Sequence, residues 1–167
     1  MKSLIFDTDI LSTFGKIKRL DLLQELIPDI QFSIPTSVYN ELLKAKDHGY
    51  DFVNYIFESG IIEVTILNRD EWNLSWKLRI EHTSLGAGEL EGISICKYRN
   101  YVLVTNDITA KNVCDQYGVQ FIDLSMILKS LLEEKILTNN EIKALIGEIE
   151  LKDKVIIKDK DDIWTTF

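Results

Sequence analysis

Carboxylates recur at four places along this chain where an apolar run meets the next element. They are Asp7, Asp9, Glu41, Glu89, Glu91 and Asp107. The runs before Asp7 and Asp107 are strand-like, and ligands of an open parallel sheet gather outside the carboxyl ends of its strands. Carboxylates brought together there repel one another, so a hard cation such as Mg²⁺ or Mn²⁺ would neutralise them. The sequence therefore predicts a metal-dependent enzyme that acts on phosphates.

Each carboxylate also has a structural explanation. Asp9 or Asp107 could cap a helix by accepting its free N–H groups, and Glu41 could be a solvated helix residue paired with a lysine. Glu91 could reach back to the start of its own helix. Residues two apart on a helix point about 200° apart, so we expect Glu89 and Glu91 to differ, one as a ligand and one as a supporting group. A functional site is favoured over these separate structural explanations, because two carboxylates end strands and the others lie on helices that would flank those ends.

Short β-branched or aromatic runs alternate with helical stretches. The expected strands are residues 3–6, 31–34, 61–65, 101–105 and 119–122. The expected helices are residues 10–15, 19–26, 36–46, 52–58, 69–81, 88–98, 109–117, 124–133 and 139–149. Strands separated by helices imply crossovers and a parallel sheet covered on both faces, hence a three-layer α/β/α sandwich. We expect residues 1–150 to form this domain and residues 151–167 to form a tail, docked through its aromatic residues Trp164 and Phe167 or flexible.

The composition is that of one ordinary globular domain. The chain has 167 residues, 46% of them hydrophobic, which is enough for one core. A net charge of −8 argues against a broad electrostatic grip on nucleic acid but leaves room for local basic contacts. No apolar run approaches the roughly 20 residues that span a membrane, and Asp7 comes too early for a signal peptide, so a cytoplasmic location is expected. Cys96 and Cys114 are expected to be buried, without a disulfide.

Other chemistry-bearing residues give weaker signals. His48 and His82 lie outside the acidic motifs and are expected in loops or at helix ends. Trp72 and Trp76, four residues apart on an expected helix, are predicted to be core residues rather than a substrate platform. Neither a Gly-rich phosphate loop nor a Ser-His-Asp arrangement is recognisable.

Taken in order, the acidic motifs resemble the PIN-domain family of metal-dependent nucleases. The matching segments, over about residues 3–132, are FDTDILS, IPTSVYNELL, LGAGELEGISICK and LVTNDITAKNVCDQYGV. The third is similar to the family's L-G-x-G-E-x-E-A-I pattern, with Gly92 where Ala is usual. The resemblance implies a parallel sheet in the order 3-2-1-4-5, with the acidic site at its carboxyl end.

The same resemblance implies a function and a set of roles. By motif match, Asp7, Glu41, Glu91 and Asp107 would hold Mg²⁺ or Mn²⁺ and serve as the catalytic residues. The supporting positions would be Asp9, Glu89, Thr105 and Asn106. The implied chemistry is metal-dependent hydrolysis of RNA phosphodiesters. Many small members resemble VapC-type toxins, so the implied partners are RNA, an antitoxin with a basic segment that enters the acidic site, and a second copy in a homodimer.

Two alternatives remain open at this point. Asp7-Thr8-Asp9 is similar to the Asp-x-Asp opening of haloacid-dehalogenase-type phosphatases, in which the first Asp is a nucleophile, but the later acidic pair of that class has no counterpart after Asp107. The second alternative is a non-catalytic PIN-like module that binds a partner. Loss of acidic residues would mark such a module, and none is lost here.

Overall fold

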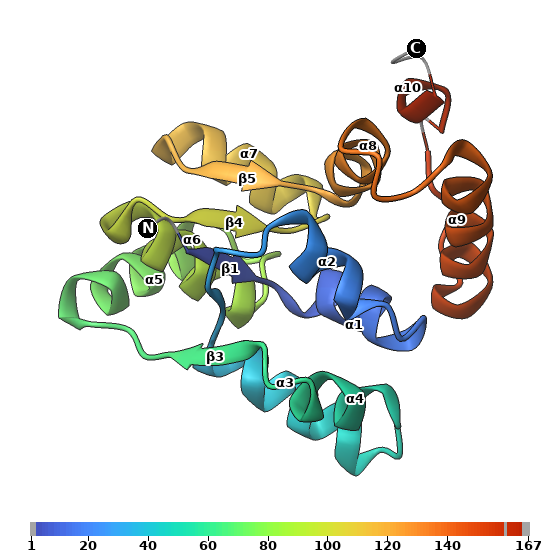
Figure 1. Cartoon of the computed structure of the whole chain (residues 1–167). Coiled ribbons are helices and arrows are strands. Elements are labelled where there is room, and N and C mark those ends of the chain that lie inside the picture. Colours follow the sequence, from blue (N-terminus) through green and yellow to red (C-terminus); the bar gives the residue numbers. More distant parts are fainter. Residues whose placement is uncertain (1–2, 159, 165–167) are drawn as a thin grey trace.

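Five short parallel strands form a single sheet in this computed structural model, which describes residues 3–158 and 160–164 (Figure 1). The strands are β1 (Leu4–Phe6), β2 (Phe32–Pro35), β3 (Ile62–Thr65), β4 (Val102–Val104) and β5 (Gln120–Ile122). Their spatial order is β3-β2-β1-β4-β5, and all four neighbouring pairs are parallel. This confirms the predicted fold class and strand order.

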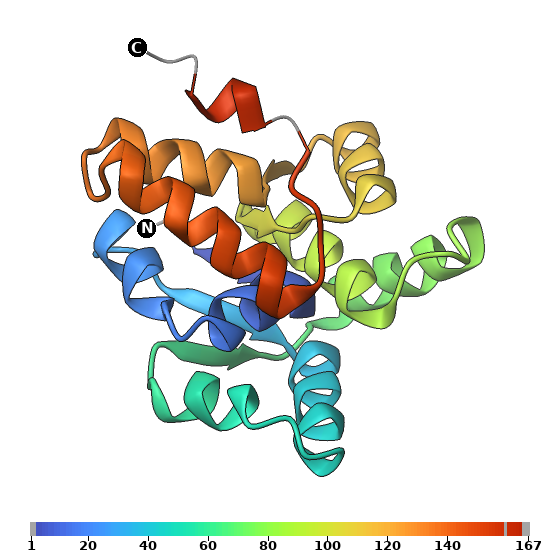
Figure 2. The same ribbon diagram turned by 90° about the vertical axis from the view of Figure 1, so that its right-hand side faces the viewer.

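Helices cover both faces of the sheet (Figures 1 and 2). They are α1 (Thr8–Lys16), α2 (Leu20–Leu26), α3 (Thr36–Asp47), α4 (Phe52–Glu58), α5 (Arg69–Glu81), α6 (Ala87–Arg99), α7 (Ile108–Tyr117), α8 (Leu124–Glu133), α9 (Asn139–Asp153) and α10 (Lys160–Trp164). Side chains alternate along the strands, so Leu4 and Phe6 join the core cluster under α1–α4 and α8–α10, while Ile5 joins the cluster under α5–α7. The sheet is therefore the middle layer of an α/β/α sandwich.

Local sequence explains where several helices begin and end. Asp7, Asp107 and Asp123 each accept a backbone N–H of the helix that they precede, which are α1, α7 and α8. Gly118 ends α7 in the left-handed region, at a φ of 65°, where glycine meets no steric penalty. Because Asp7 directly follows β1 and Asp107 closely follows β4, helix capping also fixes both carboxylates at the same edge of the sheet.

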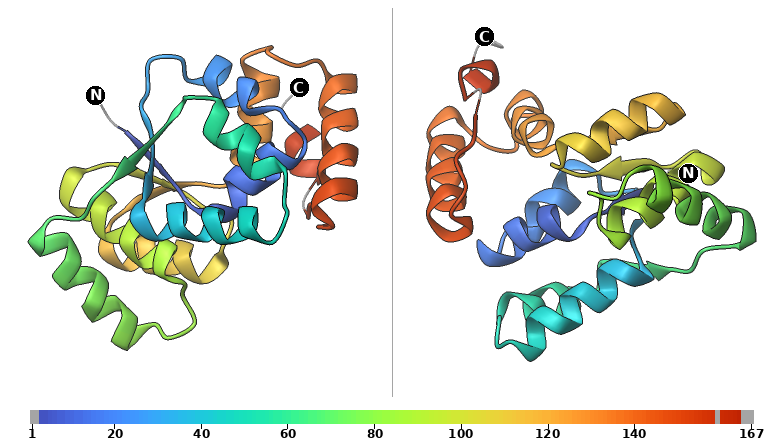
Figure 3. Two further views of the ribbon diagram at one scale, coloured as in Figure 1. Left: turned by 90° about the horizontal axis from the view of Figure 1, so that it is seen from below. Right: turned by 180° about the vertical axis from the view of Figure 1, so that it is seen from behind.

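The predicted burial of Trp72 and Trp76 is wrong. Trp72 is 58% exposed and Trp76 is 54% exposed. Helix α5 instead turns Glu71, Ser75 and Leu78 inward. Figure 3 shows α5 at the periphery of the molecule, where it packs along α6 and leaves its other side facing solvent.

The chain beyond residue 150 is packed against the domain in the part that the structure describes. Helix α9 continues to Asp153, past the predicted boundary, and Ile157 and Ile163 belong to the larger core cluster. Helix α10, which the sequence pattern did not predict, packs on α8. Phe167 lies outside the described residues.

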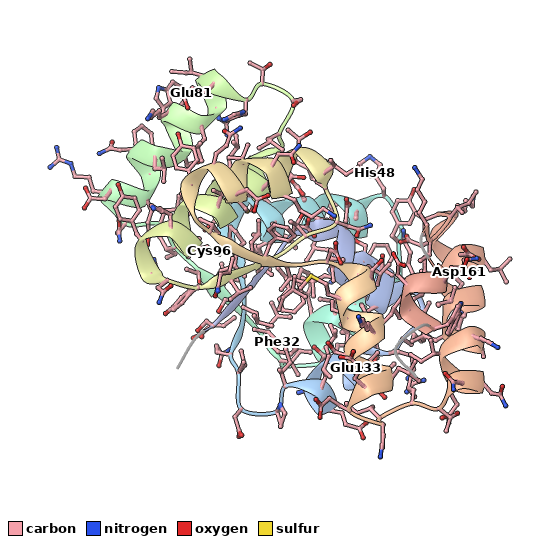
Figure 4. All side chains as sticks on the ribbon, turned by 90° about the horizontal axis from the view of Figure 1, so that it is seen from above. Phe32, His48, Glu81, Cys96, Glu133 and Asp161 are labelled. Carbon is pink, nitrogen blue, oxygen red and sulfur yellow. The ribbon has the colours of Figure 1, made fainter. Side chains whose placement is uncertain are left out.

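Both cysteines are buried and free. Cys96 belongs to helix α6, where Figure 4 labels it. His48 and His82 are the residues that end α3 and α5. Within residues 3–158 and 160–164, no helix is both long and apolar enough to cross a lipid bilayer.

Candidate active site

The pairing of β1 with β4 brings two predicted site residues to one edge of the sheet. Phe6 lies beside Val104, and the Asp7 N–H donates to the Val104 carbonyl oxygen at 3.0 Å. Asp107 follows three residues after Val104, as the first turn of α7 begins. The carboxyl ends of two central strands therefore present two carboxylates to the same space.

Beside this edge lies a small acidic pocket of about 110 Å³. Its lining residues are Asp7, Thr8, Asp9, Glu41, Gly86, Gly88 and Glu89. The Thr8 hydroxyl donates to the Glu41 carboxylate and so ties α1 to α3. Carboxylates from the end of β1 and from α1, α3 and α6 thus meet at one place.

A larger pocket of about 520 Å³ adjoins the acidic pocket, because Asp9 lines both. Asn106 and Asp107 line one part of it, and Lys16 and Asp153 another. Among the described residues that line the two pockets, Lys16 is the only lysine or arginine.

Asp7 is the most deeply buried carboxylate of this group. It is 3% exposed, and its Oδ1 atom accepts the Ile10 N–H at 3.2 Å. Its Oδ2 atom is buried and accepts no well-formed hydrogen bond from any described residue. Burial raises the pKa of Asp7 to about 7, with smaller contributions from Asp9 and Glu89, while Thr105 and the Ile10 N–H offset part of the rise. A buried carboxylate oxygen without a partner is a position at which a cation would be stabilising.

Asp9 and Glu89, the neighbouring carboxylates, also have raised pKa values. Burial raises the pKa of Asp9, and the charges of Asp153 and Asp107 raise it further, while Lys16 lowers it. Burial likewise raises the pKa of Glu89, and Asp107 and Asp9 add to the rise. The carboxylates therefore repel one another across the two pockets.

Glu91, which the family resemblance implies as a metal ligand, does not line either of the two pockets. Its Oε2 atom accepts the Ser37 backbone N–H at 3.1 Å and the Ser37 hydroxyl at 2.7 Å. Ser37 is in the first turn of α3, a helix that begins after Pro35 and has no cap from its own side chains. Glu91 supplies that cap, while Glu89, two positions earlier on α6, faces the acidic pocket.

The remaining predicted positions divide between the interior and the surface. Thr105 is fully buried, and its Oγ1 atom accepts the Asp107 N–H at 3.2 Å. Asn106 is exposed and lines the larger pocket. Thr105 therefore positions Asp107, whereas Asn106 is available to a ligand.

Asp153 is a site residue that the sequence did not point to. It ends α9, and its Oδ2 atom accepts the Thr13 hydroxyl at 2.5 Å while its Oδ1 atom pairs with Lys16. Asp153 lies 140 residues after Thr13, and nothing in its local sequence resembles the acidic motifs. Only the packing of α9 on α1 brings it to the larger pocket.

The donor set is made of oxygen atoms, the kind that Mg²⁺ and Mn²⁺ prefer. Within the described part of the chain, no three His, Cys, Asp or Glu side chains are close enough to hold one ion as they stand. The partnerless Oδ2 atom of Asp7, with Glu41 and Glu89 on the walls of its pocket, nevertheless fits a divalent cation chemically.

Gly88 allows α6 to approach α3 at this pocket. A Cβ atom at Gly88 would lie 2.7 Å from Val38 Cγ2 and 3.8 Å from the Glu41 carboxylate oxygens. Because the Val38 side chain is stiff and fully buried, Gly88→Ala is expected to lower the free energy of unfolding by about 1–3 kcal/mol. Urea denaturation of the variant would measure this. Gly147→Ala is the control, because a Cβ there meets no atom within 4 Å, and equal effects of the two changes would contradict the close-approach explanation.

The comparisons with known proteins agree with this fold. The PIN-domain family model DUF3368 matches residues 3–160, so the chain belongs to the PIN-domain family. This assignment replaces the phosphatase alternative. No curated protein sequence matches the chain.

Several solved structures share the fold at low sequence identity. A DNA-bound VapBC from Salmonella typhimurium is 18% identical with a TM-score of 0.58, and covers 74% of this chain and 98% of its own. VapBC2 from Rickettsia felis, bound to a promoter DNA fragment, is 18% identical with a TM-score of 0.57, covering 72% and 97%. The PilT N-terminus domain protein SSO1118 from Sulfolobus solfataricus P2 is 19% identical with a TM-score of 0.52, covering 78% and 93%. Because these three span more of their own chains than of this one, part of this chain has no counterpart in them.

Proposed function

We propose that this protein is a divalent-metal-dependent endoribonuclease and the toxin of a toxin–antitoxin pair. The observation that carries the proposal is the buried Asp7 at the carboxyl end of the sheet, with a partnerless Oδ2 atom and further carboxylates around it. The PIN-domain family assignment and the fold shared with VapBC structures support the same reaction class. A non-catalytic module would have no reason to keep this arrangement, because a buried carboxylate without a partner destabilises the fold.

Asp7, Glu41, Glu89 and Asp107 are the residues that would hold Mg²⁺ or Mn²⁺. A bound ion would supply an activated water molecule and neutralise the charge that develops on the phosphate during hydrolysis. The Thr8 hydroxyl would hold the Glu41 carboxylate in place, and Thr105 would hold Asp107. In this proposal Glu91 supports the site indirectly, because its cap on α3 fixes the helix that carries Glu41.

Lys16 is the residue best placed to meet a substrate phosphate. It lines the larger pocket with Asp9 and Asp107, and its ammonium group is paired with Asp153. A phosphate that entered this pocket would compete with Asp153 for the same ammonium group. The larger pocket, at about 520 Å³, has room for a nucleotide beside the acidic pocket.

An antitoxin with a basic segment fits the electrostatics of the same surface. The chain has a net charge of −8, and the two pockets contain several carboxylates against one lysine. Burial raises the pKa of Asp9 and Glu89, and repulsion between neighbouring carboxylates raises it further. Lysine or arginine side chains of a partner would relieve that repulsion. Such a segment would therefore bind where the metal and RNA bind, and would inhibit cleavage.

The proposed function is tested by metal binding and RNA cleavage in parallel. We expect Mn²⁺ to raise the melting temperature of the EDTA-treated protein more than Mg²⁺ does, because the ion binds only the folded carboxylate cluster. The same ions should support cleavage of a single-stranded RNA panel by wild type but not by Asp107→Asn. Asp115→Asn, a change of an exposed aspartate on the same helix α7, is the matched control and should behave as wild type. Metal binding without cleavage of any RNA would favour a partner-binding module, and absence of both would refute the proposed function.

A further inference from the structure

The segment at the end of α9 forms one wall of the larger pocket. Lys154 caps α9 in the left-handed region, at a φ of 54°, and the chain then runs toward α10 (Figure 2). Val155, the next residue, lines the larger pocket and is 40% exposed. Two residues later the chain is held on α9, because the Ile157 N–H donates to Glu150 Oε1 at 2.9 Å. We call residues 153–157 the C-terminal strap.

The C-terminal strap is fixed at both ends. At its start, Asp153 accepts the Thr13 hydroxyl at 2.5 Å and pairs with Lys16, both on α1. At its end, Ile157 is buried in the larger core cluster. The side chain of Val155 is therefore presented to the pocket from an anchored segment, and its position does not depend on the acidic motifs.

The larger pocket has apolar walls as well as charged ones. Ile108, the first residue of α7, lines the pocket and is 70% exposed, although it directly follows Asp107. Ile10 and Leu124 also line the pocket and are buried. Together with Val155, these side chains bring apolar surface from α1, α7, α8 and the C-terminal strap. A pocket that bound only ions and phosphate would gain nothing from this surface, which indicates a ligand with an apolar part.

We propose that this part of the larger pocket is a subsite for one nucleobase of the RNA substrate, with Val155 as a specificity-determining residue. The inference rests on the proposed function, because the base would belong to a nucleotide whose phosphate meets Lys16. The flat faces of nucleobases pack against apolar as well as aromatic side chains. Ile108 and Val155 offer such surface, and the exposed amide of Asn106 can both donate to and accept from the edge of a base.

The charge of the pocket makes contacts to the base important. Among the described residues that line the larger pocket, Lys16 is the only lysine or arginine, so a nucleotide meets one favourable charge against three aspartates. Binding must therefore draw on contacts other than phosphate contacts, and the aliphatic walls provide them. Ser12 and Thr109 add hydroxyl groups to the lining. Because Asp9 lines both pockets, a base in the larger pocket lies next to the acidic pocket.

Binding of single nucleotides to the full chain tests the subsite. NMR titration with AMP, CMP, GMP and UMP, and with ribose 5-phosphate, separates the contribution of the base from that of the phosphate. The titrations are made in Mg²⁺ and in EDTA. At least one of the mononucleotides should bind wild type about 10-fold more tightly than ribose 5-phosphate does, which is the discrimination that an apolar pocket gives. Lys16→Ala should weaken the binding of every compound, because each has the phosphate.

Substitutions in the C-terminal strap locate the contact. Val155→Ser should remove the advantage of the mononucleotides over ribose 5-phosphate and change the cut-site preference on an RNA library, whereas Val155→Ile keeps the apolar wall and should retain both. Ile156→Ser is the matched control, because Ile156 is the next residue of the strap, is 81% exposed and does not line the larger pocket. Thermal melts should be close to those of wild type for all three variants, since both positions are partly exposed.

The outcomes separate this inference from the proposed function. Mononucleotides that bind wild type no more tightly than ribose 5-phosphate would overturn the subsite, and so would a Val155→Ser variant that keeps the wild-type preference for a base. RNA cleavage with a cut-site preference that does not respond to Val155→Ser would overturn the subsite and leave the ribonuclease proposal standing. Base-dependent binding that Val155→Ser removes, in a protein that cleaves no RNA, would support the role of Val155 and refute the ribonuclease proposal.

Discussion

Asp7→Asn is expected to abolish metal-dependent RNA cleavage and at the same time to raise the melting temperature of the metal-free protein at pH 8. Asparagine keeps the shape of the side chain but removes the negative charge that a divalent cation would neutralise. Loss of a charged metal ligand should reduce the cleavage rate by at least about 1,000-fold, more than the 10- to 100-fold typical of outer residues. The gain in stability follows from the buried position of the carboxylate.

The pH dependence of this effect has a definite sign. Burial raises the pKa of Asp7 from 3.8 to about 7, so the unfolded chain loses this proton before the folded chain does. The Asp7 contribution to stability is therefore fully present below pH 4 and is lost as the pH rises to about 7. Above that pH the ionised Asp7 carboxylate lowers the free energy of unfolding by on the order of 4 kcal/mol. A buried Asn amide without a partner has a desolvation cost of its own, which cancels part of the benefit of removing the charge. We therefore expect the free energy of unfolding of the variant to rise by about 1–3 kcal/mol and its melting temperature by roughly 3–8 °C.

Thermal melts in EDTA between pH 4 and pH 8 measure this directly. The difference in melting temperature between Asp7→Asn and wild type should grow across that range and level off above pH 7. Asp29→Asn, which changes an exposed aspartate far from the site in the sequence, should track wild type at every pH. A difference between the Asp7 variant and wild type that does not depend on pH would contradict the raised pKa, and an active variant would remove Asp7 from the site.

The strand-end carboxylates could be predicted from sequence because their positions depend on local patterns. A short apolar run followed by Asp predicts both the end of a strand and the cap of the next helix, and parallel pairing then brings Asp7 and Asp107 together. The strand order came from the family resemblance, not from the pattern, because alternation of strands and helices fits several orders.

The predictions that were wrong or missing concern contacts between segments that are far apart in the sequence. Trp72 and Trp76 have the spacing of core residues, but α5 is turned the other way. Its buried residues are Glu71, Ser75 and Leu78, and Arg99 of α6 donates to Glu71. Asp153 reaches the larger pocket because α9 packs on α1, a contact that no local signal encodes. Periodicity shows which residues share a helix face, but it does not show which face meets the core.

The orientation of the two glutamates on α6 gives the sharpest remaining test of the site. Glu89 lines the acidic pocket, whereas Glu91 accepts two hydrogen bonds from Ser37 on α3. We therefore expect Glu89→Gln to reduce RNA cleavage by orders of magnitude with little loss of folding. Burial and nearby carboxylates raise the pKa of Glu89 in the folded protein, so removing this charge should not destabilise the metal-free protein.

Glu91→Ala should have the opposite pattern. It removes the cap of α3 and leaves the Ser37 N–H without its partner, which should cost about 1–2 kcal/mol of stability. Cleavage should fall only about 10- to 100-fold, because α3 still carries Glu41 into the pocket but holds it less firmly. Glu91→Gln retains an acceptor oxygen for Ser37 and should recover most of the stability. Cleavage rates at saturating Mn²⁺ and urea denaturation of the same three variants test which glutamate binds the metal. An inactive but stable Glu91→Gln variant beside an active Glu89→Gln variant would assign the metal-binding role to Glu91.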